Sequence, residues 1–277
     1  VNQDTSGGVK DWLGKVTELA EFVLAQGAAQ AREELLAGCL ACLSACHHLV
    51  DTPAAQEPSV PQGSTAEKLL LLATRALALP QVPTVTSAGL RLLQQLATKV
   101  WVLESEGVQQ LVQGAGALCA GLPLEQQQQL YAALVRAAVS PVHGRRGLHP
   151  AAQQACELLF QQLHARLRTG EEGAIEALAA LEAVFKAMHG ATAATAKMLV
   201  ACAAPVLATL SQGLRAVTSR KVLVAISAFL LPVLENFSTL LPLDDVYGLF
   251  DVLMTAFTAL DGSQQDGAGA PVYQLVA

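Results

Sequence analysis

The sequence contains few charged and few aromatic residues. Charged residues make up 14% of the 277 positions, whereas about 25% is usual for soluble domains, and the aromatic residues amount to 4%. Aromatic and β-branched residues are the main strand formers, so this composition argues against a β-sandwich, a barrel or an α/β sheet enzyme. An apolar fraction of 52% argues equally against disorder, because it provides enough surface to bury.

The sequence also lacks a basic patch. The formal net charge is −6, and the densest basic spots are the pairs Arg145-Arg146 and Arg220-Lys221. Proteins that bind nucleic acid directly usually carry a stripe of basic residues that neutralises phosphates. We therefore expect no direct binding of nucleic acid, and an acidic chain of this kind suits a protein partner with basic segments better.

Long hydrophobic runs are missing as well. The best runs, Met198–Leu210 and Val222–Leu234, have 13 residues each and contain a proline, whereas a membrane-spanning helix needs about 20 apolar residues. We expect no membrane span and, without a basic region followed by an apolar core after Val1, no signal peptide. The six cysteines lie in apolar helical stretches, which is typical of reduced thiols in the cytosol or nucleus.

Alanine (49 residues) and leucine (47 residues) dominate the composition, and both are strong helix formers. Apolar residues recur at helical spacing almost throughout, as in the stripe of Trp12, Val16, Leu19 and Val23. Prolines and glycines separate these stretches, and the longest break, residues 51–64, is expected to be a mobile loop. Residues 261–277 are expected to form a flexible tail.

The helical stretches group into pairs of about 35–47 residues, which is the size of HEAT and armadillo units. The expected fold is all-α, an α-solenoid of about five HEAT/armadillo-like helical pairs plus one extra helix, forming a single domain over residues 1–260. A single large globular bundle remains the structural alternative. The pairs cover residues 9–50, 65–103, 105–139, 150–189 and 193–239.

The strongest candidate for chemistry is the segment Cys39-Leu-Ala-Cys42-Leu-Ser-Ala-Cys46-His47-His48. Thiolates and imidazoles are zinc ligands, but on a helix Cys39 and Cys46 are about 10 Å apart along the axis, too far for one tetrahedral ion. We expect these cysteines to pack in the core beside Leu36 and Leu43. A helical enzyme with a thiol or metal site at this segment remains an alternative.

Other motifs have simpler structural explanations. Gly114, Gly116 and Gly121 lie in an apolar helix, where glycines usually allow close packing rather than phosphate binding. No catalytic, cofactor-binding or metal-binding residue is assigned, and no enzyme activity or cofactor is expected. The remaining candidates are read as surface or capping residues, namely the histidines at 143, 149, 164 and 189, the carboxylate pairs Glu33-Glu34, Glu171-Glu172 and Asp244-Asp245, and the run Gln126–Gln129.

The stretch LVQGAGALCAGLPLEQQQQLYAAL, residues 111–134, resembles an element of importin-β-type nuclear transport receptors, namely a helix with small residues, a Leu-Pro corner and a second helix. The following helices, such as HPAAQQACELLFQQLHARL, fit the same template, so the resemblance covers roughly residues 105–260. It is most similar to transportins and related exportins. The resemblance implies a segment of a longer receptor.

Such receptors carry protein cargo through nuclear pores, contact nucleoporins, respond to the GTPase Ran and occupy both nucleus and cytoplasm. The family's Ran-binding region is not recognisable in this sequence, and no site residue carries over. An alternative with the same architecture is another HEAT-type adaptor scaffold, in a phosphatase, proteasome or vesicle-coat assembly. An importin-β-like domain upstream of this sequence would decide between the two.

Overall fold

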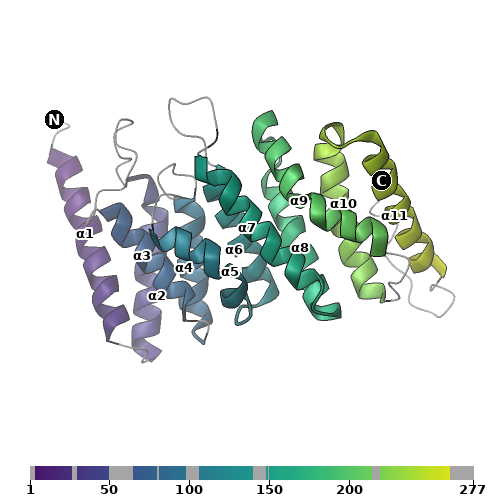
Figure 1. The fold of residues 1–277 in the computed structure, drawn as a ribbon. Helices are drawn as coiled ribbons and strands as arrows, with labels where there is room; N and C mark the ends of the chain where they lie inside the picture. The colour runs from purple at the N-terminus through teal and green to yellow at the C-terminus, as the bar shows by residue number, and fades with distance from the viewer. Residues whose placement is uncertain are drawn as a thin grey trace. The chain divides into compact units, whose positions relative to one another are not determined.

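The computed structural model describes residues 4–26, 30–49, 65–79, 81–97, 106–139, 148, 150–213 and 219–262, and the described part is helical with no strand (Figure 1). The expectation of an all-α fold is therefore confirmed at this level. The helices are α1 (Asp4–Ala25), α2 (Gln30–Ala45), η1 (His47–Leu49), α3 (Thr65–Leu77), α4 (Pro83–Leu96), α5 (Glu106–Cys119), α6 (Leu124–Val139), α7 (Pro150–Leu167), α8 (Glu171–Ala187), α9 (Ala193–Gly213), α10 (Arg220–Phe237), η4 (Ser238–Leu240) and α11 (Leu243–Gly262).

The helices cluster into two compact units, Val1–Leu159 and Phe160–Ala277, with the boundary inside α7. Each unit has its own buried core. The expectation of one continuous solenoid domain over residues 1–260 stays a prediction. The expected loop 51–64 lies outside the described residues, as does most of the expected tail, but Asp261 and Gly262 belong to α11 and correct the start of that tail.

In the first unit, α1 packs against α2, α3 against α4 and α5 against α6, and helices that are next but one in the chain also pack together. The next-but-one contacts join α1 to α3, α2 to α4, α3 to α5 and α4 to α6. Leucines fill the space between them, and most of those in α3 and α4 are completely or almost completely buried, among them Leu69, Leu72, Leu90 and Leu93. The leucine excess of the sequence therefore supplies the core that holds successive helices together.

Helices α3 and α4 approach each other closely at a glycine. A Cβ atom added to Gly89 of α4 would lie 2.6 Å from the Cβ of Ala76 in α3. No real pair of carbon atoms comes so close without a shift, so only a glycine lets α4 approach α3 at this point. The sequence offers one small residue on each side of the contact, and the alanine excess thus has a packing role beside its helix propensity.

In the second unit, α8 packs against α10, and α9 and α10 pack against α11. Four buried phenylalanines form its core, with the Phe185 ring in edge-to-face contact with Phe160, Phe229 and Phe237. Centroid separations of 5.0–6.2 Å fall in the range that favours such aromatic pairs. More than half of the chain's seven phenylalanines are used in this one cluster.

Two helices of this unit are long and apolar enough to cross a membrane by length and composition alone. They cover Ala193–Ser211 and Arg220–Leu240, somewhat longer than the 13-residue runs visible in the sequence. Half of each window is buried inside the protein, as in the core helix of a soluble domain. They are weak evidence for a span, and the expectation of none stays a prediction.

Candidate protein-binding surfaces

The cysteine-rich segment is divided between core and surface. Cys39 is buried beside Leu36 and Leu43, as expected, but Cys42 is exposed and corrects the prediction that all three cysteines share the core side. His47 follows in η1, where its Nδ1 donates a hydrogen bond to the Ser44 carbonyl at 2.8 Å. Among the described residues, this segment included, no three His, Cys, Asp or Glu side chains are arranged to hold a metal ion.

Gly114 of α5 does not serve close packing. A Cβ atom added to Gly114 would have no neighbour within 4 Å, which corrects the expectation for this residue. It borders a groove of about 620 Å³ between α3 and α5, together with Gly107, Gly121 and Arg75. Close packing between helices does depend on Gly89 of α4, whose role the sequence did not indicate.

His164 forms a hydrogen bond between two helices. His164 of α7 is half-buried, and its Nε2 lies 2.8 Å from Oγ1 of Thr209 in α9. The Thr209 hydroxyl donates its proton to the Pro205 carbonyl at 2.9 Å, so His164 Nε2 is the donor. Burial, followed by the charge of Arg168, lowers the pKa of His164. This corrects its reading as a surface or capping residue.

Of the other three candidate histidines, the structure describes His189. His189 is exposed, as expected, and its Nδ1 donates to Asn236 Oδ1 at 2.7 Å. His143 and His149 lie outside the described residues. The carboxylate pairs at 171–172 and 244–245 are exposed in the first turns of α8 and α11, where the helix dipole favours negative charge.

The glutamine run is structural rather than a polar surface. Gln127 is buried, and its Nε2 donates to the Leu122 carbonyl at 2.8 Å, which supports the corner before α6. Gln126 Nε2 donates to Ser87 Oγ at 2.8 Å and thereby joins α6 to α4. The expectation of a surface run is therefore wrong for Gln126 and Gln127, whereas Gln129 donates to Glu125 at an exposed position of the same helix.

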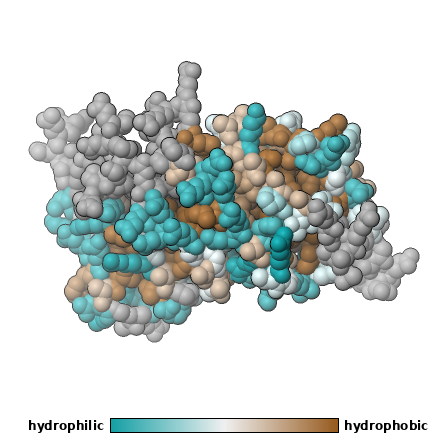
Figure 2. All heavy atoms as spheres, viewed as in Figure 1, coloured by the Kyte–Doolittle hydropathy of each residue, from teal (hydrophilic) through white to brown (hydrophobic). Residues whose placement is uncertain are grey.

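The largest exposed apolar side chains gather on α1 and α11. Figure 2 shows hydrophobic atoms reaching the visible surface among hydrophilic ones. On α1, Trp12, Leu19 and Phe22 are exposed, whereas Leu13, Ala20 and Val23 form the buried side. Of the predicted stripe, Val23 is buried whereas Trp12 and Leu19 are exposed, so the apolar sector of α1 is wider than its buried side.

On α11 the exposed apolar residues form one ridge. Leu243 is 66% exposed, Tyr247 64%, Phe250 54% and Met254 47%. The buried side, with Leu249, Val252 and Leu253, packs against the rest of the unit. Contiguous exposed apolar surface of this kind marks protein interaction sites more often than scattered single residues do.

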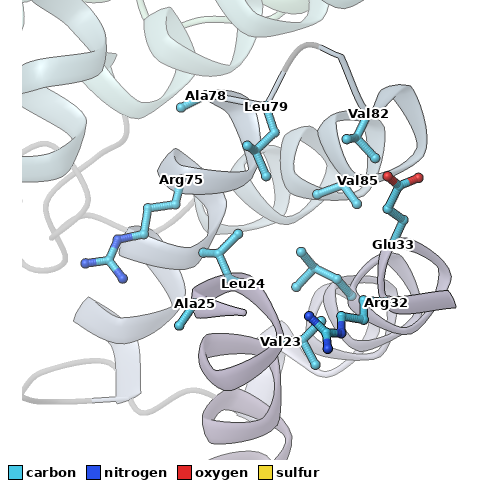
Figure 3. Close-up of a pocket in the computed structure, with 11 residues that line it drawn as sticks. Val23, Leu24, Ala25, Arg32, Glu33, Arg75, Ala78, Leu79, Val82 and Val85 are labelled. Carbon is cyan, nitrogen blue, oxygen red and sulfur yellow. The ribbon is translucent and has the colours of Figure 1, made fainter. Parts of the chain in front are cut away.

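The first unit also contains an apolar hollow of about 320 Å³ where α1 ends, α2 begins and α3 turns into α4 (Figure 3). Leu24, Leu79, Val82 and Val85 surround it, and their side chains gather around the open space in the close-up. Its volume lies at the lower end of the range for ligand pockets. An apolar side chain of a binding partner is the kind of group that this hollow fits.

Three charged residues border the hollow. Arg32 Nη1 donates to the Gln26 carbonyl at 2.9 Å and so closes the end of α1. Glu33 and Arg75 carry the other two charges. With both signs at the rim, the hollow shows no preference for one charge, so its apolar walls are its main feature.

The chain was compared with known proteins in three ways. No family model matches it, and neither the curated proteins nor the solved structures give a significant match. The fold and the surfaces above are therefore the basis of the functional proposal, together with the sequence resemblance over residues 105–260.

Proposed function

We propose that the chain is a protein-binding α-solenoid segment in which helical pairs stack side by side. The observation that supports this proposal is the packing order within each unit. Helix α2 packs against α4, and α8 packs against α10. The same order holds for α1 with α3, α3 with α5, α4 with α6 and α9 with α11. Stacked two-helix repeats produce this order, because each repeat contacts only its neighbours and the odd and even helices form separate layers.

The exposed apolar residues support the protein-binding part of the proposal. Repeat scaffolds act through extended surfaces rather than through a catalytic pocket. Both α1 and α11 carry large apolar side chains on the solvent side, among them Phe22 and Tyr247. Aromatic side chains in such positions supply much of the binding energy in protein interfaces.

We further propose that this scaffold belongs to a nuclear transport receptor of the importin-β family. The support is the resemblance over residues 111–134, where α5 ends at Cys119, a corner follows at Leu122-Pro123, and α6 begins at Leu124. The proposed partners are protein cargo, nucleoporins and the GTPase Ran, and the proposed location is the nucleus and the cytoplasm.

The experiment that tests this proposal is a pull-down of the natural protein that contains this sequence. Ran loaded with a non-hydrolysable GTP analogue and Ran loaded with GDP are immobilised in parallel. A transport receptor is expected to be retained on the GTP form and not on the GDP form. Retention on neither form at micromolar protein contradicts the transport proposal and favours an adaptor scaffold of a phosphatase, proteasome or vesicle-coat assembly.

A further inference from the structure

Helix α11 has two apolar faces, and only one of them is covered within the described part of the chain. The exposed ridge consists of Leu243, Tyr247, Phe250 and Met254. At about 100° and 1.5 Å per residue, the four residues span a sector of about 60° and a length of about 16 Å. A helix that is apolar on two faces is expected to have a neighbour on each, so the ridge, which no described residue covers, is a candidate interaction surface.

The spacing of the ridge indicates what kind of neighbour fits. Its steps of four, three and four residues are those of a heptad seam, with Tyr247 and Met254 at a positions and Leu243 and Phe250 at d positions. Side chains at this spacing fit between the side chains of a second helix that crosses at a shallow angle. The ridge therefore fits an amphipathic helix of about three turns better than a strand or an irregular loop.

The charge beside the ridge is of one sign. In the same heptad frame, Asp244 and Asp251 both occupy e positions along one edge, and both are exposed. Helix α11 contains no Lys, Arg or His. The nearest basic residues in the sequence are Arg220 and Lys221, in the first turn of α10. The chain enters α11 from the opposite end of α10, so these residues are separated from α11 by the length of that helix.

We propose that the α11 ridge binds an amphipathic helix of a partner protein that carries Lys or Arg along the edge facing Asp244 and Asp251. Charges at e and g positions select the partner of such a seam. This inference deepens the proposed scaffold function and rests on it, since it names the class of protein segment that one of its surfaces accepts.

Asp244 and Asp251 also make two other binding partners of the ridge unfavourable, namely a second copy of the chain and an anionic membrane. In a two-fold antiparallel pairing with a second copy of α11, the edges with Asp244 and Asp251 would face each other, and like charges would repel. An anionic membrane surface attracts basic segments and repels this acidic edge. The charge thus favours a basic helix over both.

The test uses two fluorescently labelled synthetic peptides of three heptads, with leucine at the a and d positions. One has lysine and the other glutamate at the e and g positions, and both are used below the concentration at which they self-associate. Binding to the whole protein is followed by fluorescence anisotropy. The lysine peptide is expected to bind at least about tenfold more tightly than the glutamate peptide, and equal affinity or no binding overturns the proposal.

Four variants test whether the binding is located on α11. Phe250→Ala removes an exposed side chain and is expected to weaken binding of the lysine peptide by about tenfold, whereas Leu35→Ala, at an exposed position of α2, is expected to leave it unchanged. The double variant D244K/D251K is expected to reverse the preference between the two peptides. The matched double variant E34K/E157K changes the net charge equally, and if it has the same effect, the binding is generic charge attraction and the proposal is overturned.

Two further measurements test the other occupants. If light scattering detects a dimer and the Phe250→Ala variant is monomeric, the ridge binds a second copy of the chain and the proposal is overturned. Binding to phosphatidylserine vesicles that depends on Phe250 would overturn it in favour of a membrane. Ran binding is measured separately. If the protein binds Ran but neither peptide, only the inference about the ridge is contradicted. If it binds the lysine peptide but not Ran, only the transport proposal is contradicted.

Discussion

The ring of Phe185 in α8 stands edge-on against the ring of Phe237 at the end of α10, with centroids 5.0 Å apart and an interplanar angle of 85°. The same Phe185 ring contacts Phe160 of α7 and Phe229 of α10. One side chain thus joins three helices of the second unit. Because α8 and α10 are next-but-one neighbours, this contact also forms part of the packing order on which the proposed solenoid depends.

Phe185→Leu is expected to destabilise the second unit by about 1–2 kcal/mol, because it removes three aromatic edge contacts while keeping most of the buried apolar area. Phe250→Leu makes the same chemical change at an exposed position and is expected to stay within about 0.5 kcal/mol. Urea unfolding followed by far-UV circular dichroism measures both. Equal effects of the two substitutions would contradict the central position of Phe185.

Two glycine-to-alanine substitutions are expected to have opposite signs. In a helix, alanine is favoured over glycine by about 1 kcal/mol, and Gly114 has open space around an added Cβ, so Gly114→Ala is expected to stabilise. Gly89→Ala places its Cβ 2.6 Å from that of Ala76 and is expected to destabilise by about 1–3 kcal/mol despite the same propensity gain. Thermal unfolding of the two variants is the measurement, and a stabilised Gly89→Ala would show that α3 and α4 are farther apart than described.

His164 is expected to make stability depend on pH. Burial and the charge of Arg168 lower its pKa from the ordinary value of 6.5, so between the two values the unfolded chain binds more protons than the folded one. The free energy of unfolding therefore falls as the pH drops through about 6.5 and continues to fall until the folded pKa is reached. His164→Gln keeps a donor toward Thr209 and is expected to flatten this dependence, as measured by urea unfolding at a series of pH values. An unchanged slope would contradict the assignment to His164.

Thiol reactivity is expected to differ along α2. Cys42 is exposed, whereas Cys39 is buried, and this burial, with a smaller contribution from Cys42, raises the pKa of Cys39. Because the thiolate is the reactive form, limited alkylation followed by tandem mass spectrometry is expected to label Cys42 well before Cys39.

Purified protein is expected to contain no stoichiometric zinc or iron. One equivalent of metal that is lost on Cys42→Ala would restore the metal-site hypothesis.

Most of the helix boundaries could be predicted from the sequence, because prolines and glycines interrupt a regular apolar spacing. The corner Leu122-Pro123 before α6 is an example, as is Gly170, whose φ of 120° suits glycine at the start of α8. The orientation of the outer helices could not be predicted. Both α1 and α11 are apolar around much of their circumference, so the pattern alone did not place Trp12 or Tyr247 toward solvent.

The hydrogen bonds by which polar side chains connect helices could not be predicted from the sequence either. His164 meets Thr209 across 45 residues, and Gln126 meets Ser87 across 39. The neighbouring sequence of these residues does not indicate their hydrogen-bond partners, because the distance between the two partners depends on how whole helices stack. The exposed ridge of α11 has a local signal, its heptad spacing beside aspartates, but only burial shows that this side lacks a neighbour within the described chain.

The central claim is that the helices of each unit form a stack of repeats rather than one globular bundle. In a stack, each helix depends mainly on its neighbours, so a defect in α1 should stay local. Native-state hydrogen exchange of Leu13→Ala, which removes a buried side chain of α1, measures this directly. We expect faster exchange in α1 and in its neighbours α2 and α3, with wild-type rates in α5 and α6. Equal acceleration in all six helices of the unit would contradict the stack and indicate a single cooperative bundle.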